Sequence, residues 1–406
     1  MFEIKGKYAT ARVFADHVED EAMAQIYNLL NQPFVEDSSI AIMPDVHAGK
    51  GCTIGFTQTI ADKVCPNLVG VDISCGMLWV NLGKVDIDLE RFDSAVHEAV
   101  PCGDCVHDSP TLDEDFFKRL HCHSALNMMN RLTCSCGSLG GGNHFVELDK
   151  DDDGNVYLVI HSGSRNLGLQ VANYYQNKAV DECNYRKTEL AERKKTLIAT
   201  LKKEHREKEI QNSLALLTKD FEQNVHRVPD DLAWLEGDNM ENYLDDMAIC
   251  AEFASRSRHL MCENILKAYY GSVPKLETRE TLHNYIDLDR KILRKGSISL
   301  NNSELALIPI NMRDGSLIVK GKGNPDYNYS GPHGAGRLLS RSKAKETLDM
   351  SDYEDAMKGI YTSCVVPSTI DESPMAYKNM DEILANIEDT ATVVKVIRPI
   401  YNFKAI

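Results

Sequence analysis

The chain has 406 residues, of which 43% are hydrophobic and 26% charged, and its formal net charge is −16 at pH 7. This composition is typical of a soluble globular protein, and the length allows one large domain or two of medium size. The acidic charge argues against nonspecific nucleic-acid binding over the whole surface. No apolar run is long enough to cross a membrane, and residues 1–6 lack a signal-peptide pattern, so we expect a cytoplasmic protein.

The N-terminal part of the chain predicts β-strands, because short apolar runs alternate there with glycines and single polar residues. We expect strand, turn and strand over residues 39–82, where the apolar runs lie at 40–43, 68–71 and 77–80. Further strands are expected at 156–160 and 316–319.

A long charged segment follows, with no proline over 169–225. From 186 to 209, lysines and glutamates recur three and four residues apart, which is typical of an exposed helix. A narrow apolar stripe runs through Leu190, Leu197, Leu201, Leu214 and Leu217. We expect a helical hairpin that projects from the core, and more apolar helix over 231–271. The hairpin serves either as a solvated strut without chemistry or as an arm that docks a partner or RNA.

A local basic stretch contrasts with the acidic chain. It extends from Arg313 to Lys345, and only Asp314 and Asp326 oppose its seven basic residues. These basic residues are Arg313, Lys320, Lys322, Arg337, Arg341, Lys343 and Lys345. The stretch is either a solvated face or the basic patch that RNA handling by an acidic protein requires.

Four of the 13 histidines, His144, His161, His283 and His333, lie beside glycine or asparagine at the ends of apolar runs. A histidine in this position can point into a cleft, because loops place functional groups there. Any one of them alone is better interpreted as structural. Four in similar settings favour a shared site.

Asp72 and Cys75 are three residues apart between Gly70 and Gly76. Thiolate and imidazole ligands suit zinc, and an added carboxylate extends the range to manganese or iron. The alternative is a buried structural thiol beside a carboxylate in a turn.

The segment 330–337 surrounds His333 with small residues, so a phosphate could approach the backbone closely. Arg337 could then clamp the phosphate through two hydrogen bonds, and a neutral His333 imidazole could attack phosphorus. The alternative is a glycine-rich turn that carries an exposed histidine.

With these motifs, the chain resembles the RtcB-type RNA-splicing ligases over nearly its whole length, apart from the helical insertion and the stretch 100–135. The set of blocks in this order is highly specific, although any one block would be modest support. The matching blocks are 43–51, 69–77, 142–147, 161–165, 283–285, 294–296, 333–337 and 374–378. The resemblance implies an α+β fold in one domain, 1–406, with central β-sheets, surrounding helices and a helical insertion at 169–245.

The resemblance also implies the residues of the site. The expected ligands of two Mn²⁺ ions are Asp72, Cys75, His144, His161 and His283, with the cysteine bridging both ions. His333 is the expected nucleophile, and Asp45 would fix its tautomer. The expected guanosine-nucleotide positions are Asn143, His144, Glu147, His283, Asn284, Pro309, Asn311, Met312, Ser316, His333, Gly334, Ala335, Gly336, Tyr377 and Lys404. Arg165 and Arg337 would face RNA phosphates.

The implied reaction joins an RNA 3′-phosphate or 2′,3′-cyclic phosphate to a 5′-hydroxyl in three steps. His333 attacks the α-phosphate of GTP and diphosphate leaves. The guanylate then passes to the RNA 3′-phosphate, after any cyclic phosphate has been opened. A 5′-hydroxyl finally attacks the activated end and GMP leaves. Manganese would act as a Lewis acid and as a template.

Two segments depart from the family pattern. Residues 309–313 read Pro-Ile-Asn-Met-Arg, where the family usually has Pro-Gly-Ser-Met-Gly. Because isoleucine does not readily adopt positive φ, we expect a changed backbone near the nucleotide phosphates. The C-terminus usually ends in Lys-Gly, whereas here Ala405 and Ile406 follow Lys404.

The 12 cysteines of a cytosolic chain are expected as reduced thiols, metal ligands or core residues. One cluster lies at Cys102, Cys105, Cys122, Cys134 and Cys136, with His121 and His123. A Cys-x-x-Cys pair suits one edge of a zinc site, but the second half lacks a matching pair. The cluster is therefore either a structural zinc site or a set of reduced thiols in a loop.

Three functions follow from this reading. The first is the GTP- and Mn²⁺-dependent RNA ligase, acting in RNA repair or tRNA splicing. The second is a metal-dependent end-healing phosphodiesterase with weak or no ligation, which the changed loop at 309–313 motivates. The third is a noncatalytic RNA-binding scaffold, which has no use for a buried Cys/His/Asp cluster. We expect a monomer without a membrane partner, and an archease-like activator as a further candidate partner.

Overall fold

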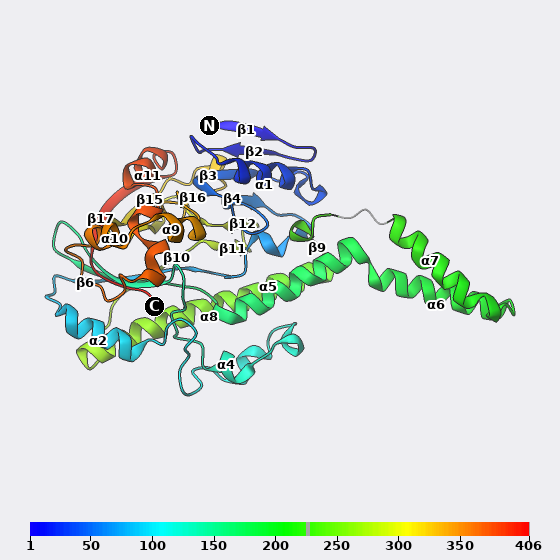
Figure 1. The fold of residues 1–406 in the computed structure, drawn as a ribbon, viewed down its shortest axis with the longest axis horizontal. Coiled ribbons are helices and arrows are strands. Elements are labelled where there is room, and N and C mark those ends of the chain that lie inside the picture. Colours follow the sequence, from blue (N-terminus) through cyan, green and yellow to red (C-terminus); the bar gives the residue numbers. More distant parts are fainter. Residues whose placement is uncertain (225–227, 406) are drawn as a thin grey trace.

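The computed structural model describes residues 1–224 and 228–405. Its main body contains two β-sheets surrounded by helices, so the α+β class is confirmed (Figure 1). The six-stranded sheet has the order β1 (Phe2–Lys5), β2 (Thr10–Val13), β3 (Ile40–His47), β4 (Ile54–Thr59), β12 (Ile292–Lys295) and β11 (Asn284–Asp287). Only the β2–β3 pair in this sheet is parallel.

The seven-stranded sheet is antiparallel throughout. Its order is β10 (Thr278–Leu282), β6 (Gly76–Gly83), β8 (Val156–Ser162), β7 (Phe145–Lys150), β17 (Ala391–Phe403), β15 (Gly315–Gly321) and β14 (Leu305–Asn311). The first and last strands contact each other, and the Leu307 amide donates to the Thr281 hydroxyl (3.0 Å). The sheet therefore curls, and Trp79, Val159 and Ile318 pack in the core that it encloses.

Two short ribbons complete the strands, β13 (Ser297–Ser299) with β16 (Ser330–Pro332) and β5 (Lys63–Val64) with β9 (Leu235–Glu236). Four of the expected strands are present: 40–43 in β3, 77–80 in β6, 156–160 in β8 and 316–319 in β15. The strand expected at 68–71 is wrong. A short 3-10 helix, η2 (Pro66–Leu68), ends there and a loop follows, in which Gly70 has φ +96°. Apolar burial without strand pairing produced the same sequence pattern.

The helices that cover the sheets include α1 (Asp20–Leu30), α2 (Leu89–Ala99), α5 (Arg165–Val180) and the long α8 (Gly237–Tyr270). Helix α8 runs beside α5 and then over the seven-stranded sheet with α2 (Figure 1). Its first part, with Phe253, lies in the largest core, and its last part, with Ile265, lies in the core under that sheet. The helix expected over 231–271 is thus α8, which begins six residues later.

Short helices fill the remaining connections. They are α3 (Glu114–Phe117), α4 (Met129–Thr133), α9 (Arg341–Thr347), α10 (Met350–Ala356) and α11 (Met380–Asn386). Short 3-10 helices lie at η1 (Pro33–Val35), η3 (His123–Ala125), η5 (Glu207–Glu209), η6 (Asp230–Leu232), η7 (Pro325–Tyr327), η8 (Pro367–Glu372) and η9 (Pro374–Ala376), and a short π-helix lies at η4 (Asp181–Tyr185). No helix among the described residues is long and apolar enough to span a bilayer.

Helices α6 (Lys187–Lys203) and α7 (Ile210–Asn224) form an arm that projects from the body (Figure 1). The two helices pack on each other, and the Arg193 guanidinium of α6 lies over the Phe221 ring of α7. Leu201 and Phe221 are only 4% and 6% exposed. The part that projects from the body is shorter than the helical insertion expected at 169–245. Residues from 169 to 180 belong to α5, whose Val171 and Tyr175 are buried in the main core.

Candidate active site

The candidate site begins at one end of four neighbouring strands of the seven-stranded sheet, in the order β10, β6, β8 and β7. His283 follows β10, Cys75 precedes β6, His161 is near the end of β8, and His144 precedes β7. Antiparallel pairing brings the end of one strand beside the start of the next. Residues that are far apart in the sequence therefore form one row at this sheet edge.

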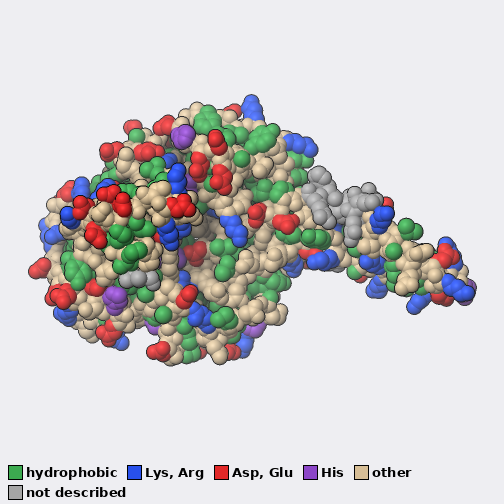
Figure 2. Space-filling model, viewed as in Figure 1, with side chains coloured by type: hydrophobic (Ala, Val, Ile, Leu, Met, Phe, Trp, Pro, Cys, Tyr) green, Lys and Arg blue, Asp and Glu red, His purple; other side chains and the backbone are tan. Residues whose placement is uncertain are grey.

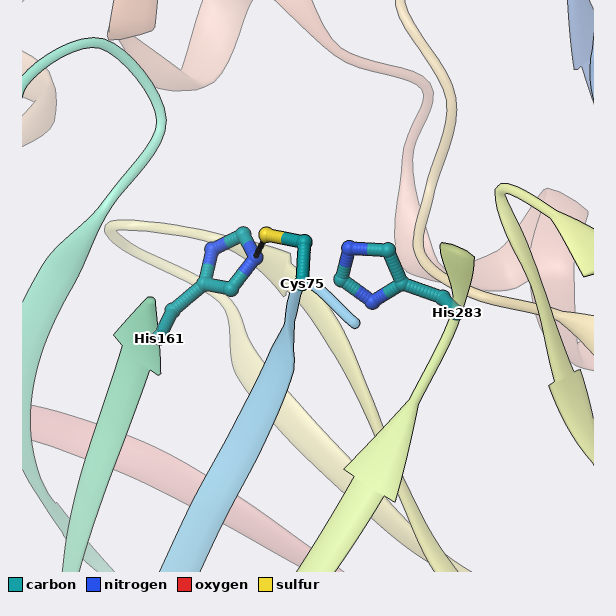
Figure 3. Close-up of side chains that lie close together, drawn as sticks. All are labelled: Cys75, His161 and His283. Atoms are coloured by element: carbon teal, nitrogen blue, oxygen red, sulfur yellow. Dashed lines mark hydrogen bonds between the residues drawn. The ribbon is translucent and has the colours of Figure 1, made fainter. Parts of the chain in front are cut away.

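The side chains in this row converge. Cys75 Sγ lies 3.2 Å from His161 Nε2 and 3.5 Å from His144 Nε2, and His144 Nε2 lies 2.9 Å from Asp72 Oδ2. Donor atoms of Cys75, His161 and His283 lie within 4.8 Å of one another, and so do those of Asp72, Cys75 and His144. Figure 3 shows the thiol between the His161 and His283 rings. The structure thus brings together all five expected ligands, with Cys75 in both groups.

The hydrogen bonds of the His144 and His161 rings leave one nitrogen of each ring available to bind a cation. His144 Nδ1 contacts the Leu139 carbonyl (2.9 Å), and His161 Nδ1 contacts the Asn143 carbonyl (3.0 Å). A carbonyl only accepts, so each Nδ1 carries the proton and each Nε2 presents a lone pair inward. His144 Nε2 then faces a carboxylate oxygen and a thiol. These groups attract one another only when a proton or a metal ion lies between them, so this donor set fits a metal centre.

Burial also prepares the ligands for a metal ion. It lowers the pKa of His161 and of His283 well below 6.5, so both rings are neutral near pH 7. Burial raises the pKa of the Cys75 thiol well above 9.0, which means that a bound ion would have to displace its proton. Burial opposes ionisation of Asp72, but the contacts with His144 and Cys75 and the charge of Arg165 together outweigh this effect and lower the pKa.

A buried arginine of α8 holds the ends of β6 and β8 in place. Arg258 is 0% exposed, and its Nη1 donates to the carbonyls of Ser74 (2.9 Å) and Ser162 (2.8 Å). Its Nε donates to Glu280 on β10 (2.7 Å). Three of the four strands that carry ligands are therefore tied to one guanidinium. Gly163 is required at this point, because a Cβ there would lie 2.2 Å from an Asp72 oxygen.

His333 lies on the other side of the site, directly after β16. Its Nδ1 lies 2.6 Å from Asp45 Oδ2, and its backbone N–H donates to the same oxygen (3.0 Å). Asp45 is fully buried in β3, whereas the His333 side chain is 21% exposed. The carboxylate accepts from Nδ1, which leaves Nε2 as the free nitrogen. Gly336 allows the close approach of these segments, since a Cβ there would lie 2.7 Å from the Asp45 carbonyl.

The ligand group and the nucleophile candidate form one site. The His283 ring lies 5.0 Å from the His333 ring and 5.2 Å from the His161 ring, measured between ring centroids. His283 is 3% exposed and lies between the two groups. A phosphate group placed at His333 would lie beside an ion held by His283.

A cavity of about 530 Å³ opens beside His333 and His161. It is large enough for a nucleotide-sized ligand. Of the expected nucleotide positions, it is lined by Asn143, Glu147, Pro309, Asn311, Met312, His333, Gly334, Ala335, Gly336, Tyr377 and Lys404. His144, His283, Asn284 and Ser316 do not line it.

Asn284 has a structural contact instead, and Ser316 is buried in a strand. Asn284 accepts a hydrogen bond from the Gly296 amide (2.9 Å) and so fixes the turn between β12 and β13. Ser316 is fully buried in β15 and its hydroxyl has no partner among the described atoms.

The two arginines expected to face RNA occupy different surroundings. Arg165 is directed toward the loop below the site, where its Nη2 donates to the Gly103 carbonyl (2.9 Å). Arg337 lines the cavity, but its Nη1 contacts Glu372 (3.2 Å) and the Tyr377 hydroxyl (3.0 Å). Both guanidinium groups therefore have protein partners in this state.

The changed loop at 309–313 contains an irregularity, because the pairing of β14 with β15 shifts register between Pro309 and Asn311. Ile310 belongs to β14, is 3% exposed and does not have positive φ, so the side chain adds to the apolar core under β14 and β15. Asn311 Oδ1 accepts from the amides of Arg313 (3.0 Å) and Asp314 (2.9 Å). These two amides therefore already have a hydrogen-bond acceptor within the turn.

The cysteine cluster at 102–136 does not form a metal site. Among the described residues, only the two groups that share Cys75 bring three suitable ligand atoms together. Cys122 and Cys136 are buried in the main core, and Cys105 is exposed. The zinc alternative is thus not supported, and the thiols are free.

Three residues near the site escaped the sequence analysis. Arg258 stands out in the sequence as a charged residue within an apolar helix, but its contacts with three strands are evident only in the folded structure. His47 follows Asp45 by two residues and lines the cavity, with Nδ1 on the Asp45 carbonyl (2.9 Å). Glu372 lies in a short turn just before the block 374–378, but outside it, and its importance depends on contacts that the sequence does not show.

Comparison with known proteins identifies the family. The family model described as tRNA-splicing ligase RtcB matches residues 25–126 and 113–405. RNA-splicing ligase RtcB of Escherichia coli K12 is 30% identical over 423 residues, and the alignment covers 94% of each chain. tRNA-splicing ligase RtcB of Aeropyrum pernix is 26% identical, with 94% of this chain and 91% of the relative covered. The chain therefore belongs to the RtcB family and is a ligase of that family, as the resemblance predicted.

Proposed function

We propose that this protein is a GTP- and Mn²⁺-dependent RNA ligase that joins 3′-phosphate or 2′,3′-cyclic phosphate ends to 5′-hydroxyl ends, in RNA repair or tRNA splicing. The observation that carries this proposal is the placement of an Asp45-bound His333 beside a buried Cys/His/Asp group and a nucleotide-sized cavity. Family membership supports the same reaction.

In the first step, His333 Nε2 attacks the α-phosphorus of GTP. An N–P bond forms while the bond to diphosphate breaks. The ring keeps its Nδ1 proton and gains positive charge, which the buried Asp45 carboxylate 2.6 Å away stabilises. Asp45 also holds the ring so that Nε2 faces the cavity. It therefore acts on both the tautomer and the orientation of the nucleophile.

Asp72, Cys75, His144, His161 and His283 would hold two manganese ions, because their donor atoms form two groups that share Cys75. When bound, these ions supply Lewis-acid stabilisation of the charge that develops on phosphate oxygens. Lys404 and Glu147 line the far wall of the cavity and offer a donor and an acceptor to the guanine base. The RNA 3′-phosphate then takes the guanylate from His333, and the 5′-hydroxyl displaces GMP.

The second candidate is an end-healing phosphodiesterase, and the turn at Asn311 favours it. Because Asn311 consumes the amides of Arg313 and Asp314, this loop offers fewer donors to nucleotide phosphates. Labelling separates the two functions. The protein is incubated with Mn²⁺ and GTP labelled at the α-phosphate, and the ligase predicts a covalent, acid-labile label that His333→Ala abolishes. Opening of a cyclic phosphate without any protein label would establish the phosphodiesterase instead.

A further inference from the structure

Glu372 is a buried carboxylate at which the cationic wall of the cavity converges. It is 3% exposed, at the end of the turn η8. Its Oε2 accepts from the Tyr377 hydroxyl (2.7 Å) and lies 3.4 Å from Lys404 Nζ. Its Oε1 lies 3.2 Å from Arg337 Nη1 and 2.6 Å from Arg341 Nη1. Four polar groups that line the cavity therefore share one anion.

The neighbouring carboxylate serves only part of this set. Asp371 pairs with Arg341 (2.8 Å) and Lys345 (3.4 Å), but its side chain has no contact with Lys404 among the described atoms. Glu372 is thus the counter-ion of Lys404, while both carboxylates restrain the arginine side of the wall. This difference makes Asp371 a matched control for Glu372.

Lys404 lies between two buried carboxylates. Besides its contact with Glu372, its charge acts on Glu147, whose Oε1 accepts from Asn402 Nδ2 (2.6 Å). The backbone of Lys404 is fixed, because its N–H donates to Cys364 Sγ (3.1 Å) and its carbonyl accepts from the same thiol (3.0 Å). Only the flexible side chain can therefore choose between Glu372 and Glu147.

We propose that Glu372 is a positioning residue that sets the base selectivity of the cavity by holding the Lys404 ammonium away from Glu147. A base edge that combines a carbonyl with N–H donors, as in guanine, needs a cation and an ionised acceptor that are not already paired with each other. Without the charge of Glu372, Lys404 turns to Glu147 and the two neutralise each other. The inference rests on the proposed function, because it concerns the nucleotide of that reaction.

The test measures protein guanylylation with Mn²⁺ for the wild type, Glu372→Gln and Asp371→Asn, with GTP and ATP as alternative substrates. Glutamine keeps the shape and still accepts from Tyr377, but it loses the charge. Loss of one charge-assisted contact predicts a rise in the KM for GTP of about tenfold or more, with kcat changed less than about threefold. The preference for GTP over ATP falls by a similar factor, whereas Asp371→Asn leaves KM and preference nearly unchanged.

A double variant distinguishes an effect that acts through Lys404 from a general structural effect of Glu372→Gln. If Glu372 acts through Lys404, adding Glu372→Gln to Lys404→Met changes the GTP preference no further. The inference is overturned if Glu372→Gln keeps the wild-type KM and preference, or if the two substitutions add independently. A Glu372→Gln protein that does not fold, judged by thermal unfolding, also overturns it, because the role would then be structural. Failure of the wild type to become labelled would instead refute the proposed function.

Discussion

The site and the arm place their polar side chains in opposite ways. At the site, residues in or next to β3, β6, β7, β8, β10 and β16 meet, and most of their polar groups are buried and partnered. In the arm, charged side chains of both signs lie on the surface (Figure 2). The ion pairs there are mostly between residues three or four apart. The site depends on the whole fold, whereas the arm depends on local sequence. Substitutions should therefore have large effects at the site and small effects in the arm.

The largest effect is expected at His333. His333→Ala should abolish protein guanylylation and ligation, because no other imidazole in the cavity is held by a buried carboxylate through Nδ1 among the described residues. The change also leaves the buried Asp45 carboxylate with only the backbone N–H of residue 333 as a partner at Oδ2, so the melting temperature should fall while the protein still folds. Guanylylation is measured with labelled GTP, and stability by thermal unfolding. Ligation that persists in this variant would contradict the site as described.

A smaller but still large effect is expected for Asp45→Asn. The amide keeps the shape of the side chain but can no longer stabilise a positively charged His333 ring. Guanylylation should slow on the order of 100-fold or more, which is the usual range for a lost acid–base or orienting partner. Single-turnover rates of label incorporation test this. Equal losses of GTP binding and rate would indicate a damaged cavity instead.

Glu147→Gln should stabilise the folded protein and at the same time weaken its binding of GTP. Burial raises its pKa from 4.5 to about 7, although Asn402 and Lys404 partly oppose this. Between these values the folded protein retains a proton that the unfolded chain has lost, so stability falls as the pH rises. Glu147→Gln should remove this loss and stabilise the protein above pH 7 by up to roughly 3 kcal/mol, with no gain near pH 4.

Denaturant unfolding of the Glu147→Gln protein at both pH values measures the difference. The variant should bind GTP more weakly than the wild type, because an amide replaces one carboxylate oxygen by an N–H donor and removes the negative charge that faces the base. Equal gains at both pH values would show that packing, rather than ionisation, produces the effect.

The two regions also differ in how far sequence predicts them. The charge spacing of α6 was enough to locate a helix, because exposed helical pairs depend on residues three and four apart. The ligand set was found through the resemblance of several blocks, since Asp72 with Cys75 alone is a weak pattern. Glu372 could not be found, because its importance arises from four partners that only the fold brings together. The strand expected at 68–71 failed for a related reason. Apolar residues there are buried by tertiary packing rather than by pairing in a sheet.

The smallest effect is expected from removal of the arm. Asn184 exchanges hydrogen bonds with Val228 (2.8 and 3.0 Å), so the base of the arm is closed and a short glycine-serine linker can replace residues 187–224. The shortened protein should keep its guanylylation rate within about threefold and its stability within about 0.5 kcal/mol, as for most surface changes.

Ligation of a short oligonucleotide and of a long structured RNA, each measured at several salt concentrations, then separates the two roles of the arm. A solvated strut predicts no change with either substrate. A docking arm predicts a loss that is confined to the long RNA and a weaker dependence on salt, because lysine contacts with phosphates are lost. A loss with the short substrate as well would mean that the arm supports the site, and the contrast between the two regions would fail.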